Sequence, residues 1–418
     1  MRVSIITYGS LGDVRPLVAL GAGLVRAGHS VVLPADREFR PLIERHGLEH
    51  RPLSGDVRAV TQGDAADALF RRGVNPVQLT RALVRMAQDY GEAWTREYLE
   101  ASRGCDLLVT AGLGFYTGIG IAESLGVPWA GVGLQPMGPT RAFPPPLMKP
   151  PAMRLPGAVN IMLHVALMQV IWQGFRPSIN RARRSVLGLP PIPLIGPGPR
   201  MMRETPPVLY AHSPQVLPRP ADWPEFCHVP GFWFLDEGMD WEPPAGLRRF
   251  LDDGPPPVYV GFGSMGGYDP AATTALVLEA LGDRRAVLSA GWGGLDAKAL
   301  PPTVHGLESA PHDWLFPRMA AVVHHGGAGT TAAALCAGVP GFVVPFLGDQ
   351  PFWGARVHAL GVGPAPLPRT ELTPSRLAAA LALMDDPDMR ARAADLGARI
   401  RAEDGVGTAV NILEQTVR

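Results

Sequence analysis

Hydrophobic positions along the chain fall into two kinds of segment. Short aliphatic runs, such as Val3 to Tyr8 and Ser30 to Leu33, predict buried strands. Between these runs the apolar residues recur at helical spacing as far as Ala27, and Gly28 closes the helix. The first strand ends in Gly9-Ser10-Leu11-Gly12, so a tight turn is expected to lead directly from strand to helix.

The second half of the chain begins in the same way. The apolar run Val258 to Phe262 ends in Gly263-Ser264-Met265-Gly266, and a helical pattern near Ala271 to Leu281 leads to the run Ala286 to Ser289. Strands that alternate with helices form parallel sheets covered on both faces. The sequence therefore predicts the α/β class, with one Rossmann-like domain in each half. Four further strands are expected at Asp106 to Thr110, Pro128 to Leu134, Ala320 to His324 and Gly341 to Pro345.

The length of the chain supports two domains. Its 418 residues exceed one comfortable core and suit two domains of about 200 residues. Proline and glycine are dense and periodicity is weak from about Pro214 to Pro257. We therefore predict an N-terminal domain over 1–213, a linker over 214–257 and a C-terminal domain over 258–418, whose last helix can pack back on the first domain. Ligands of doubly wound sheets lie beyond the carboxyl ends of the strands, so the active site is expected in an interdomain cleft.

The composition of the chain mainly excludes some classes of partner and of cellular location. The chain has 38 basic and 38 acidic residues, without the basic excess of nucleic-acid binders, so nucleic acid is not an expected partner. Its three cysteines lie far apart, and the N-terminus has no basic leader followed by a long apolar run. We therefore expect a cytoplasmic protein. Lysine occurs only at Lys149 and Lys298, and abundant Ala, Gly and Pro are typical of a GC-rich bacterial genome.

The most informative stretch is HHGGAGTT, residues 324–331. An apolar strand stops at a glycine cluster and a helix begins at once, which leaves free backbone N–H groups and a helix dipole to bind an anion. Glycines let a diphosphate approach the backbone, while a hydroxyl and an imidazole add donors. We assign the phosphate site to His325, Gly327, Gly329 and Thr330, and we expect His324 to be structural because strand alternation turns it away from its neighbour.

This stretch resembles the donor-binding signature of family 1 glycosyltransferases with the GT-B fold. The segment FLGDQPFW, residues 346–353, is similar to the sugar-contacting segment of that family. The combination is most similar to the sterol-glucosyltransferase-like and bacterial natural-product branches. The resemblance implies that Asp349 and Gln350 bind the hydroxyls of the donor sugar, although Asp349 also suits a helix cap. It also implies that Ser264 contacts the distal phosphate, although a turn serine often bonds its own backbone.

The chain departs from the family pattern at the nucleoside end. Many relatives carry a glutamate for the ribose hydroxyls where this chain has Ala333, and plant-type relatives stack the base on a tryptophan where it has Ser309. The base is then expected beside Ala310 and His312, with nearby Trp314 equally suited to the core. The co-substrate is accordingly UDP-glucose or a dTDP-sugar, and no other cofactor is implied.

Glycosyl transfer to a hydroxyl requires a general base near the acceptor oxygen. Asp13 follows the first strand at the edge of the expected cleft, where a carboxylate can take the acceptor proton, as the resemblance also implies. Asp13 also suits a cap of a helix that starts near Val14, and Ser10 is expected to line the same pocket. No metal is implied, because Asp386-Pro387-Asp388 lies between two helical segments and predicts a turn. A single displacement that inverts the anomeric carbon is the simplest route.

The acceptor itself is expected to be hydrophobic. Segment 137–156 is rich in proline and methionine, and a long helical pattern follows from Ala158 to Val186. Phe143 and Met148 suit a pocket for a sterol, macrolide, polyketide or flavonoid-like scaffold, and this region suits an ordinary core equally well. Contact with a membrane, through Met162 to Trp172, is expected to be peripheral at most.

These observations favour an inverting glycosyltransferase that moves a hexose, with glucose as the first choice, to a hydroxyl of a hydrophobic small molecule. A dTDP-deoxysugar or rhamnosyl transferase is the alternative that Ala333 keeps open. A non-catalytic protein that binds a nucleotide sugar and activates a partner enzyme is the alternative from another class. A dinucleotide oxidoreductase is disfavoured, since neither Gly-Ser turn completes a Gly-x-Gly-x-x-Gly motif.

Overall fold

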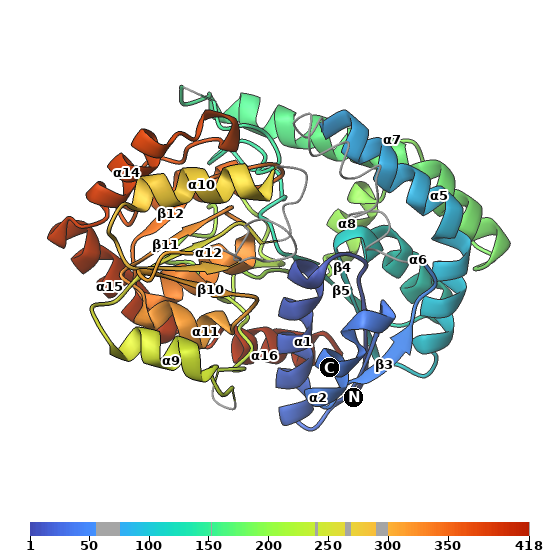
Figure 1. The fold of residues 1–418 in the computed structure, drawn as a ribbon. Coiled ribbons are helices and arrows are strands. Elements are labelled where there is room, and N and C mark those ends of the chain that lie inside the picture. Colours follow the sequence, from blue (N-terminus) through green and yellow to red (C-terminus); the bar gives the residue numbers. More distant parts are fainter. Residues whose placement is uncertain (56–75, 152, 239–240, 264–268, 290–299, 418) are drawn as a thin grey trace.

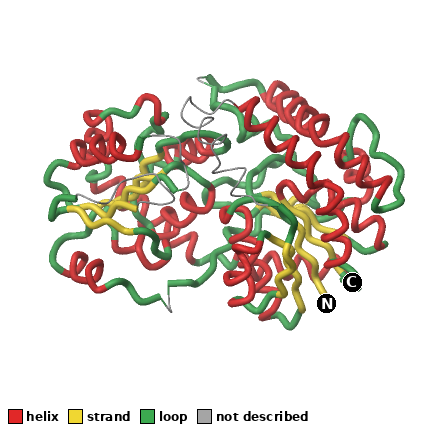
Figure 2. The backbone as a smooth tube through the Cα atoms, turned by 45° about the vertical axis from the view of Figure 1, so that its right-hand side comes forward, coloured by secondary structure: helices red, strands yellow, loops and turns green. Residues whose placement is uncertain are grey.

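The computed structural model describes residues 1–55, 76–151, 153–238, 241–263, 269–289 and 300–417. It contains two separate parallel sheets, each with helices packed around it (Figures 1 and 2). The prediction of two α/β halves is therefore confirmed. The N-terminal half runs from blue to green in Figure 1 and the C-terminal half from yellow to red.

The N-terminal sheet has seven strands in the order β3-β2-β1-β4-β5-β6-β7, all paired in parallel. Its strands are β1 (Arg2–Ile6), β2 (Ser30–Ala35), β3 (Glu49–Pro52), β4 (Leu107–Ala111), β5 (Trp129–Gly133), β6 (Val208–Tyr210) and β7 (Cys227–His228). Its helices are α1 (Leu11–Arg26), α2 (Arg40–Arg45), α5 (Pro76–Ala101), α6 (Phe115–Leu125), α7 (Gly157–Ser185) and α8 (Gly198–Glu204).

The C-terminal sheet has five strands in the order β10-β9-β8-β11-β12, again all parallel. Its strands are β8 (Val258–Gly261), β9 (Ala286–Ser289), β10 (Val304–Leu307), β11 (Ala321–His324) and β12 (Gly341–Val343). The helices of this part are α9 (Ala245–Asp252), α10 (Pro270–Leu281), α11 (His312–Leu315), α12 (Ala328–Ala337), α13 (Gln350–Ala359), α14 (Pro374–Leu383), α15 (Pro387–Arg401) and α16 (Gly405–Val417).

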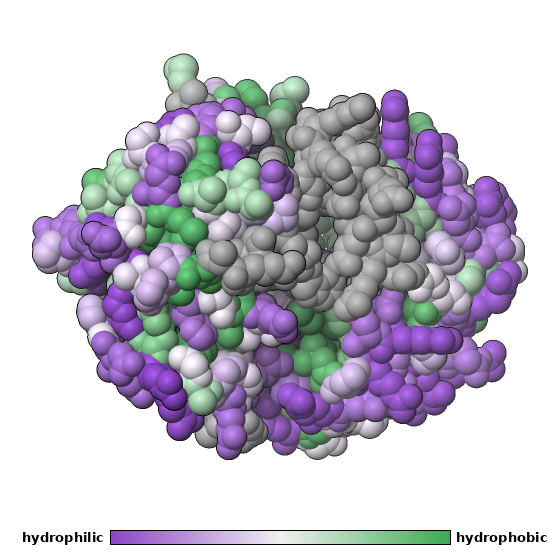
Figure 3. Space-filling view, viewed as in Figure 1, coloured by the Kyte–Doolittle hydropathy of each residue, from purple (hydrophilic) through white to green (hydrophobic). Residues whose placement is uncertain are grey.

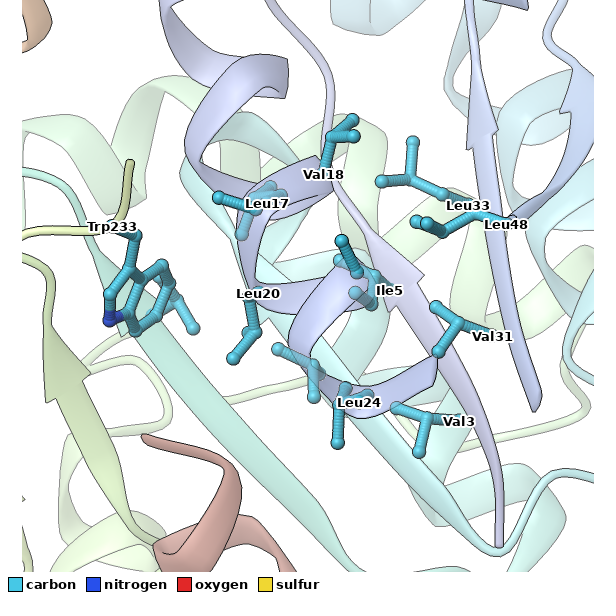
Figure 4. Packing of buried hydrophobic residues seen from close by; sticks show 14 of the residues in the cluster. Val3, Ile5, Leu17, Val18, Leu20, Leu24, Val31, Leu33, Leu48 and Trp233 are labelled. Carbon is cyan, nitrogen blue, oxygen red and sulfur yellow. The ribbon is translucent and has the colours of Figure 1, made fainter. Parts of the chain in front are cut away.

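The first strand and helix show how the sequence pattern becomes packing. Leu17, Leu20 and Leu24 recur at helical spacing along α1, and all three are fully buried. They pack on Val3 and Ile5 of β1 (Figure 4). Each fully buried leucine contributes about 1.5–3 kcal/mol relative to an exposed one, which fixes α1 on the sheet.

The last helix packs on the N-terminal half, as the sequence allowed. Ala409, Val410 and Leu413 of α16 belong to the same buried cluster as β1 and α1. Gly23 of α1 permits the close approach, because a Cβ atom there would lie 2.2 Å from Val406. The chain therefore crosses between its halves twice, and α16 ties the end of the molecule to its beginning.

The segment 214–257 contains more regular structure than the predicted linker. β7 pairs with β6 and so belongs to the N-terminal sheet, whereas Leu247 of α9 is fully buried in a cluster with Tyr259 of β8. The segment is therefore shared between the two halves. A strand of two residues is too short to leave an alternating pattern, which is why the sequence does not reveal it.

Candidate active site

Both sheets reverse their strand order beside their first strand, and ligands of doubly wound sheets gather there. In the N-terminal sheet this point lies between β1 and β4, and in the C-terminal sheet it lies between β8 and β11. Asp13 follows β1, and His325 follows β11 directly. The two main predicted site residues therefore both lie at a switch point.

The turn after β1 holds Asp13 by its own backbone. α1 begins at Leu11 rather than near Val14, with Ser10 at the N-cap position. The Ser10 N–H and hydroxyl donate to Asp13 Oδ2 at 2.8 and 3.0 Å. A Cβ atom on Gly9 would lie 2.3 Å from that oxygen, so only glycine leaves room for the carboxylate. Asp13 thus accepts a backbone N–H at the start of its own helix, and its side chain remains partly exposed.

The surroundings of Asp13 favour a base. Burial of the carboxylate raises its pKa above the ordinary 3.8, and the two hydrogen bonds from Ser10 offset only part of that rise. A carboxylate with a raised pKa binds a proton more readily than a solvated one. The two roles weighed for this residue, base and helix cap, are therefore compatible in one geometry.

The helix start after β11 differs because no side chain among the described residues caps it. Gly327 is the N-cap residue of α12, and neither a side-chain cap nor an acidic residue lies in the first turn. Beside it, His325 Nδ1 is buried without a hydrogen-bond partner among the described residues. Burial lowers the pKa of this imidazole to about 4, so it is neutral at pH 7. Free N–H groups beside an unpartnered imidazole form a suitable place for an anion.

The two glycines of this motif have different steric roles. A Cβ atom on Gly327 would lie 2.5 Å from His325 Nε2, so this glycine makes room for the imidazole. A Cβ atom on Gly329 would meet nothing within 4 Å. His324 is structural, as predicted, because it is fully buried and its Nδ1 accepts the Gly326 N–H at 3.1 Å.

Asp349 contacts both halves of the chain. Its carboxylate accepts a hydrogen bond from Trp353 Nε1 at 2.7 Å and another from the side chain of Gln135, which follows β5. Burial raises its pKa, and the negative charge of Asp13 raises it further. Asp349 is the N-cap residue of α13, as the helix-cap alternative expected, but its side chain makes no capping hydrogen bond there. The two carboxylates, from opposite halves, therefore lie close enough to interact electrostatically.

Gln350 supports the loop that carries Asp349. Its side-chain carbonyl accepts the N–H groups of Phe346 and Leu347 at 2.7 and 3.0 Å, and the residue is 5% exposed. This oxygen is therefore engaged with the backbone before any ligand arrives. The predicted contact between Gln350 and the sugar stays a prediction.

Side-chain packing fixes the two halves relative to each other. The ring of Phe143 lies 5.5 Å from that of Phe352, and the ring of His212 lies 6.2 Å from that of Trp353. Arg15 of α1 also pairs with Glu237. Phe143 thus contacts the other half. Met148, which lies between Phe143 and α7, is partly exposed. Their predicted roles in an acceptor pocket stay predictions.

The residues predicted to lie beside the nucleobase, Ala310 and His312, belong to a region of aromatic packing. His312 stacks on Phe316 with ring centroids 4.3 Å apart, and burial lowers its pKa to about 3. Ala310 belongs to the same hydrophobic cluster. Trp314 is partly buried and packs on Trp241, with ring centroids 5.0 Å apart, at the edge of this cluster.

Two further expectations concern phosphate and metal. Ser264 lies outside the described residues. Asp386 accepts the Asp388 N–H at 3.0 Å as the N-cap of α15, so the Asp-Pro-Asp string begins this helix and is not the predicted turn. Within the described part of the chain, no group of three or more His, Cys, Asp or Glu residues is arranged to hold a metal ion. A groove of about 660 Å³ lies elsewhere, lined by Trp129, Arg200 and Phe226 among others, and contains no predicted site residue.

The sequence analysis missed Gln135 and Trp353 as partners of Asp349. Trp353 lies four residues after Asp349, one helical turn along α13, and this spacing could have identified it. Gln135 is a polar residue just beyond the carboxyl end of a buried strand, which is a general signal for a ligand-facing position.

Solved structures with the same architecture are glycosyltransferases. The glycotransferase of kitacinnamycin has a TM-score of 0.71 at 20% identity, covering 99% of this chain and 98% of that one. The glycosyltransferase VinC in complex with dTDP has a TM-score of 0.66 at 19% identity, covering 100% and 99%. At these identities the likeness shows the fold.

Sequence comparison identifies the family. The glycosyltransferase family 28 N-terminal domain model matches residues 3–130, and the erythromycin biosynthesis protein CIII-like C-terminal domain model matches residues 285–414. The sterol 3-beta-glucosyltransferase of Neosartorya fischeri is 38% identical over 432 residues, which cover 99% of this chain. The chain belongs to the GT-B glycosyltransferases. It spans 29% of the length of that relative.

The predicted GT-B fold and its sterol-glucosyltransferase-like branch are thus confirmed. The similar sterol 3-beta-glucosyltransferases of Neosartorya fischeri, Aspergillus fumigatus and Neurospora crassa are fungal, so these relatives do not support the bacterial origin suggested by composition.

Proposed function

We propose that the chain is an inverting glycosyltransferase that moves a hexose from a nucleoside diphosphate sugar to a hydroxyl of a hydrophobic small molecule. The observation that carries the proposal is the chemistry at the two switch points, with the Ser10-bound carboxylate of Asp13 in one half and the helix start of α12 beside the unpartnered Nδ1 of His325 in the other. We infer that Asp13 is the base and that the other half holds the donor. The three free cysteines are compatible with a cytoplasmic setting, which remains part of the proposal.

The proposed chemistry is a single displacement. Asp13 takes the proton of the acceptor hydroxyl, and the oxygen attacks the anomeric carbon on the face opposite the diphosphate. The bond from the anomeric carbon to the acceptor oxygen forms while its bond to the phosphate oxygen breaks, so an α-linked donor gives a β-glycoside. We assign the charge on the departing diphosphate to His325, Thr330 and the N–H groups of α12 rather than to a cation.

The substrates follow from chemistry and from the relatives. Asp349 supplies an acceptor for sugar hydroxyls, and glucose is the first choice because the matched relatives are named sterol 3-beta-glucosyltransferases. That name also supports a hydrophobic acceptor that offers a hydroxyl, such as a sterol. Phe143 and Met148 are our candidates for contacting it.

A dTDP-sugar is the second candidate donor. Ala333 packs in a hydrophobic cluster of the C-terminal half and brings no carboxylate for a ribose 2′-hydroxyl. A thymidine donor lacks that hydroxyl, and VinC, which shares the fold, was crystallised with dTDP. A deoxysugar or a rhamnosyl donor is then included in the proposal.

Calorimetry with the full chain tests the donor site first. Tight binding of UDP or dTDP supports the site and selects the donor, whereas binding of NADH alone would favour an oxidoreductase. Donors that bind are then paired with a panel of sterol, macrolide and flavonoid acceptors, and NMR coupling gives the anomeric configuration of the product. A retained α-linkage contradicts single displacement. Tight donor binding without transfer to any acceptor favours the non-catalytic alternative.

A further inference from the structure

Exposed apolar side chains are concentrated in one part of the N-terminal half. Of the fourteen large hydrophobic residues with exposed side chains in the described part of the chain, ten lie between residues 147 and 202. Scattered single apolar residues are normal on a protein surface, but a concentration of this kind marks an interaction site. These ten are Leu147, Met153, Val159, Met162, Val165, Met168, Val170, Leu194, Ile195 and Met202.

Three of the five exposed apolar residues on helix α7 lie along one side of it. At 100° per residue, Val159, Met162 and Val170 point outward from the same side of the helix, and Met162 is 69% exposed. The same side continues into exposed Arg181 and Arg184 near the end of α7. Hydrophobic atoms lie at the top edge of the molecule in Figure 3, over the start of α7 in Figure 1. The outward side of α7 is therefore apolar first and cationic afterwards.

A turn beside α7 presents two more apolar side chains. Three α7 side chains, Gln169, Trp172 and Gln173, donate to the carbonyl of Leu194 at 2.8, 2.9 and 2.7 Å. These bonds fix the turn against the helix, while Leu194 and Ile195 remain 61% and 67% exposed. A rigid turn that exposes two adjacent apolar residues is suited to insertion into an apolar phase.

The charge of this region distinguishes it from the rest of the chain. Residues 124–203 contain nine Arg and Lys and no Asp or Glu, so the remainder has 29 basic and 38 acidic residues. Among ion pairs between described residues, only Arg183 and Arg200 of the nine take part, with Glu123 and Glu204. A cationic region beside apolar side chains is complementary to an anionic lipid surface.

The structure of α7 indicates that it would lie on such a surface rather than cross it. By length and composition α7 is apolar enough to span a bilayer. However, its inner side packs on α5 and buries polar Asn160 and His164, each hydrogen-bonded to the protein. One side is therefore committed to the fold and only the other is open.

We propose that the outward side of α7 and the turn 193–196 dock on a bilayer that carries anionic phospholipid headgroups. The apolar side chains would enter the interfacial region while Arg181 and Arg184 meet the phosphates. The proposal goes beyond glycosyl transfer. One consequence rests on the proposed function: the docked helix would lie next to the segment assigned to the acceptor. Asn160 and His164 of α7 are hydrogen-bonded to the carbonyls of Arg141 and Phe143 in that segment.

Vesicle flotation with the full chain tests the docking. We expect the protein to float with phosphatidylcholine vesicles that contain about one third phosphatidylglycerol, to remain unbound with phosphatidylcholine alone, and to be partly released by high salt. Met162→Glu with Val170→Glu should lower the bound fraction about tenfold. Arg181→Gln with Arg184→Gln should lower it about threefold and reduce the dependence on salt. Nucleotide binding by calorimetry should be unchanged in both variants.

The matched control is Leu383→Glu. Leu383 is 56% exposed on α14 of the other half, so the substitution makes the same apolar-to-acidic change away from the region. It should leave flotation unchanged. The proposal is overturned if the wild-type chain ignores phosphatidylglycerol, or if Met162→Glu with Val170→Glu floats normally. Sedimentation that shows a dimer converted to a monomer by this pair, without vesicle binding, would identify a second copy of the chain as the occupant instead.

Discussion

The two halves share a strand order but differ at the starts of their key helices. In the N-terminal sheet β1 lies between β2 and β4, and in the C-terminal sheet β8 lies between β9 and β11. At α1 the first turn is occupied by the chain's own carboxylate, because Asp13 accepts the Ser10 N–H. At α12 no side chain caps the first turn and His325 Nδ1 lacks a partner among the described residues.

This difference explains how one fold, used twice, supports two tasks. A helix start that already holds a carboxylate repels a diphosphate, whereas an uncapped start attracts one. The N-terminal half is therefore suited to supply a base and the C-terminal half to bind the donor. The interaction of Asp13 with Asp349 links the two tasks in space.

The largest expected effect follows from removing the base. Asp13→Asn keeps the hydrogen bonds from Ser10 but cannot take a proton, so kcat should fall by about 10²- to 10⁴-fold while UDP affinity is unchanged. Burial raises the pKa of Asp13, so charging it at neutral pH costs folding free energy, and Asn should not lower the melting temperature.

Two measurements accompany this variant. The acidic limb of the wild-type kcat/KM profile should lie above pH 3.8, with activity lost as pH falls through the raised pKa of Asp13. Asp386→Asn, which changes a capping carboxylate of α15, is the control and should leave kcat unaltered. Normal turnover by Asp13→Asn would show that the base lies elsewhere.

The second prediction converts one helix start into the other. Thr330 is the third residue of α12, as Asp13 is the third residue of α1. In Thr330→Asp the new carboxylate can accept the Gly327 N–H and fill the anion site. Nucleotide affinity should therefore fall by about 100-fold. The melting temperature of the free protein should stay equal or rise, because the carboxylate caps the helix. Calorimetry and thermal melts measure both. Thr330→Val removes only the hydroxyl and should cost about tenfold in affinity; equal losses in the two variants would contradict the role of charge.

The third prediction concerns the imidazole beside α12. His325→Ala should weaken UDP binding by about tenfold to 100-fold, as for a hydrogen bond to a charged group. Burial holds the pKa of His325 near 4, and a bound diphosphate should raise it, so wild-type affinity should rise as pH falls from 7 to 5. This pH dependence should disappear in His325→Ala. Exposed His358→Ala on α13 is the control, and an affinity as low as that of His325→Ala would indicate a general effect on the half.

Much of this arrangement could be predicted from local sequence. Apolar runs gave the strands at the switch points, and glycine-rich turns placed Asp13 and His325 at their ends. These features depend on neighbours along the chain. β7 was missed because two residues leave no period, and α1 was expected to begin later because Ser10 and Asp13 both suit a helix start.

Contacts between the halves could not be predicted in this way. The bond from Gln135 to Asp349 joins residues from the two different sheets, and no spacing in the sequence encodes it. Such contacts depend on how two independently formed sheets face each other.

The smallest predicted effect tests the bond between the halves. Gln135→Leu removes one of the two hydrogen bonds that other side chains donate to the Asp349 carboxylate and leaves that from Trp353, so kcat/KM should fall about three- to tenfold, equivalent to about 1 kcal/mol. The bond from Gln135 lowers the pKa of Asp349, so its loss should move an acidic limb due to Asp349 to higher pH. Exposed Gln415→Leu on α16 makes the same change away from the site. If both variants show wild-type pH profiles, Asp349 is positioned by its own half alone, and the comparison of the halves reduces to their helix starts.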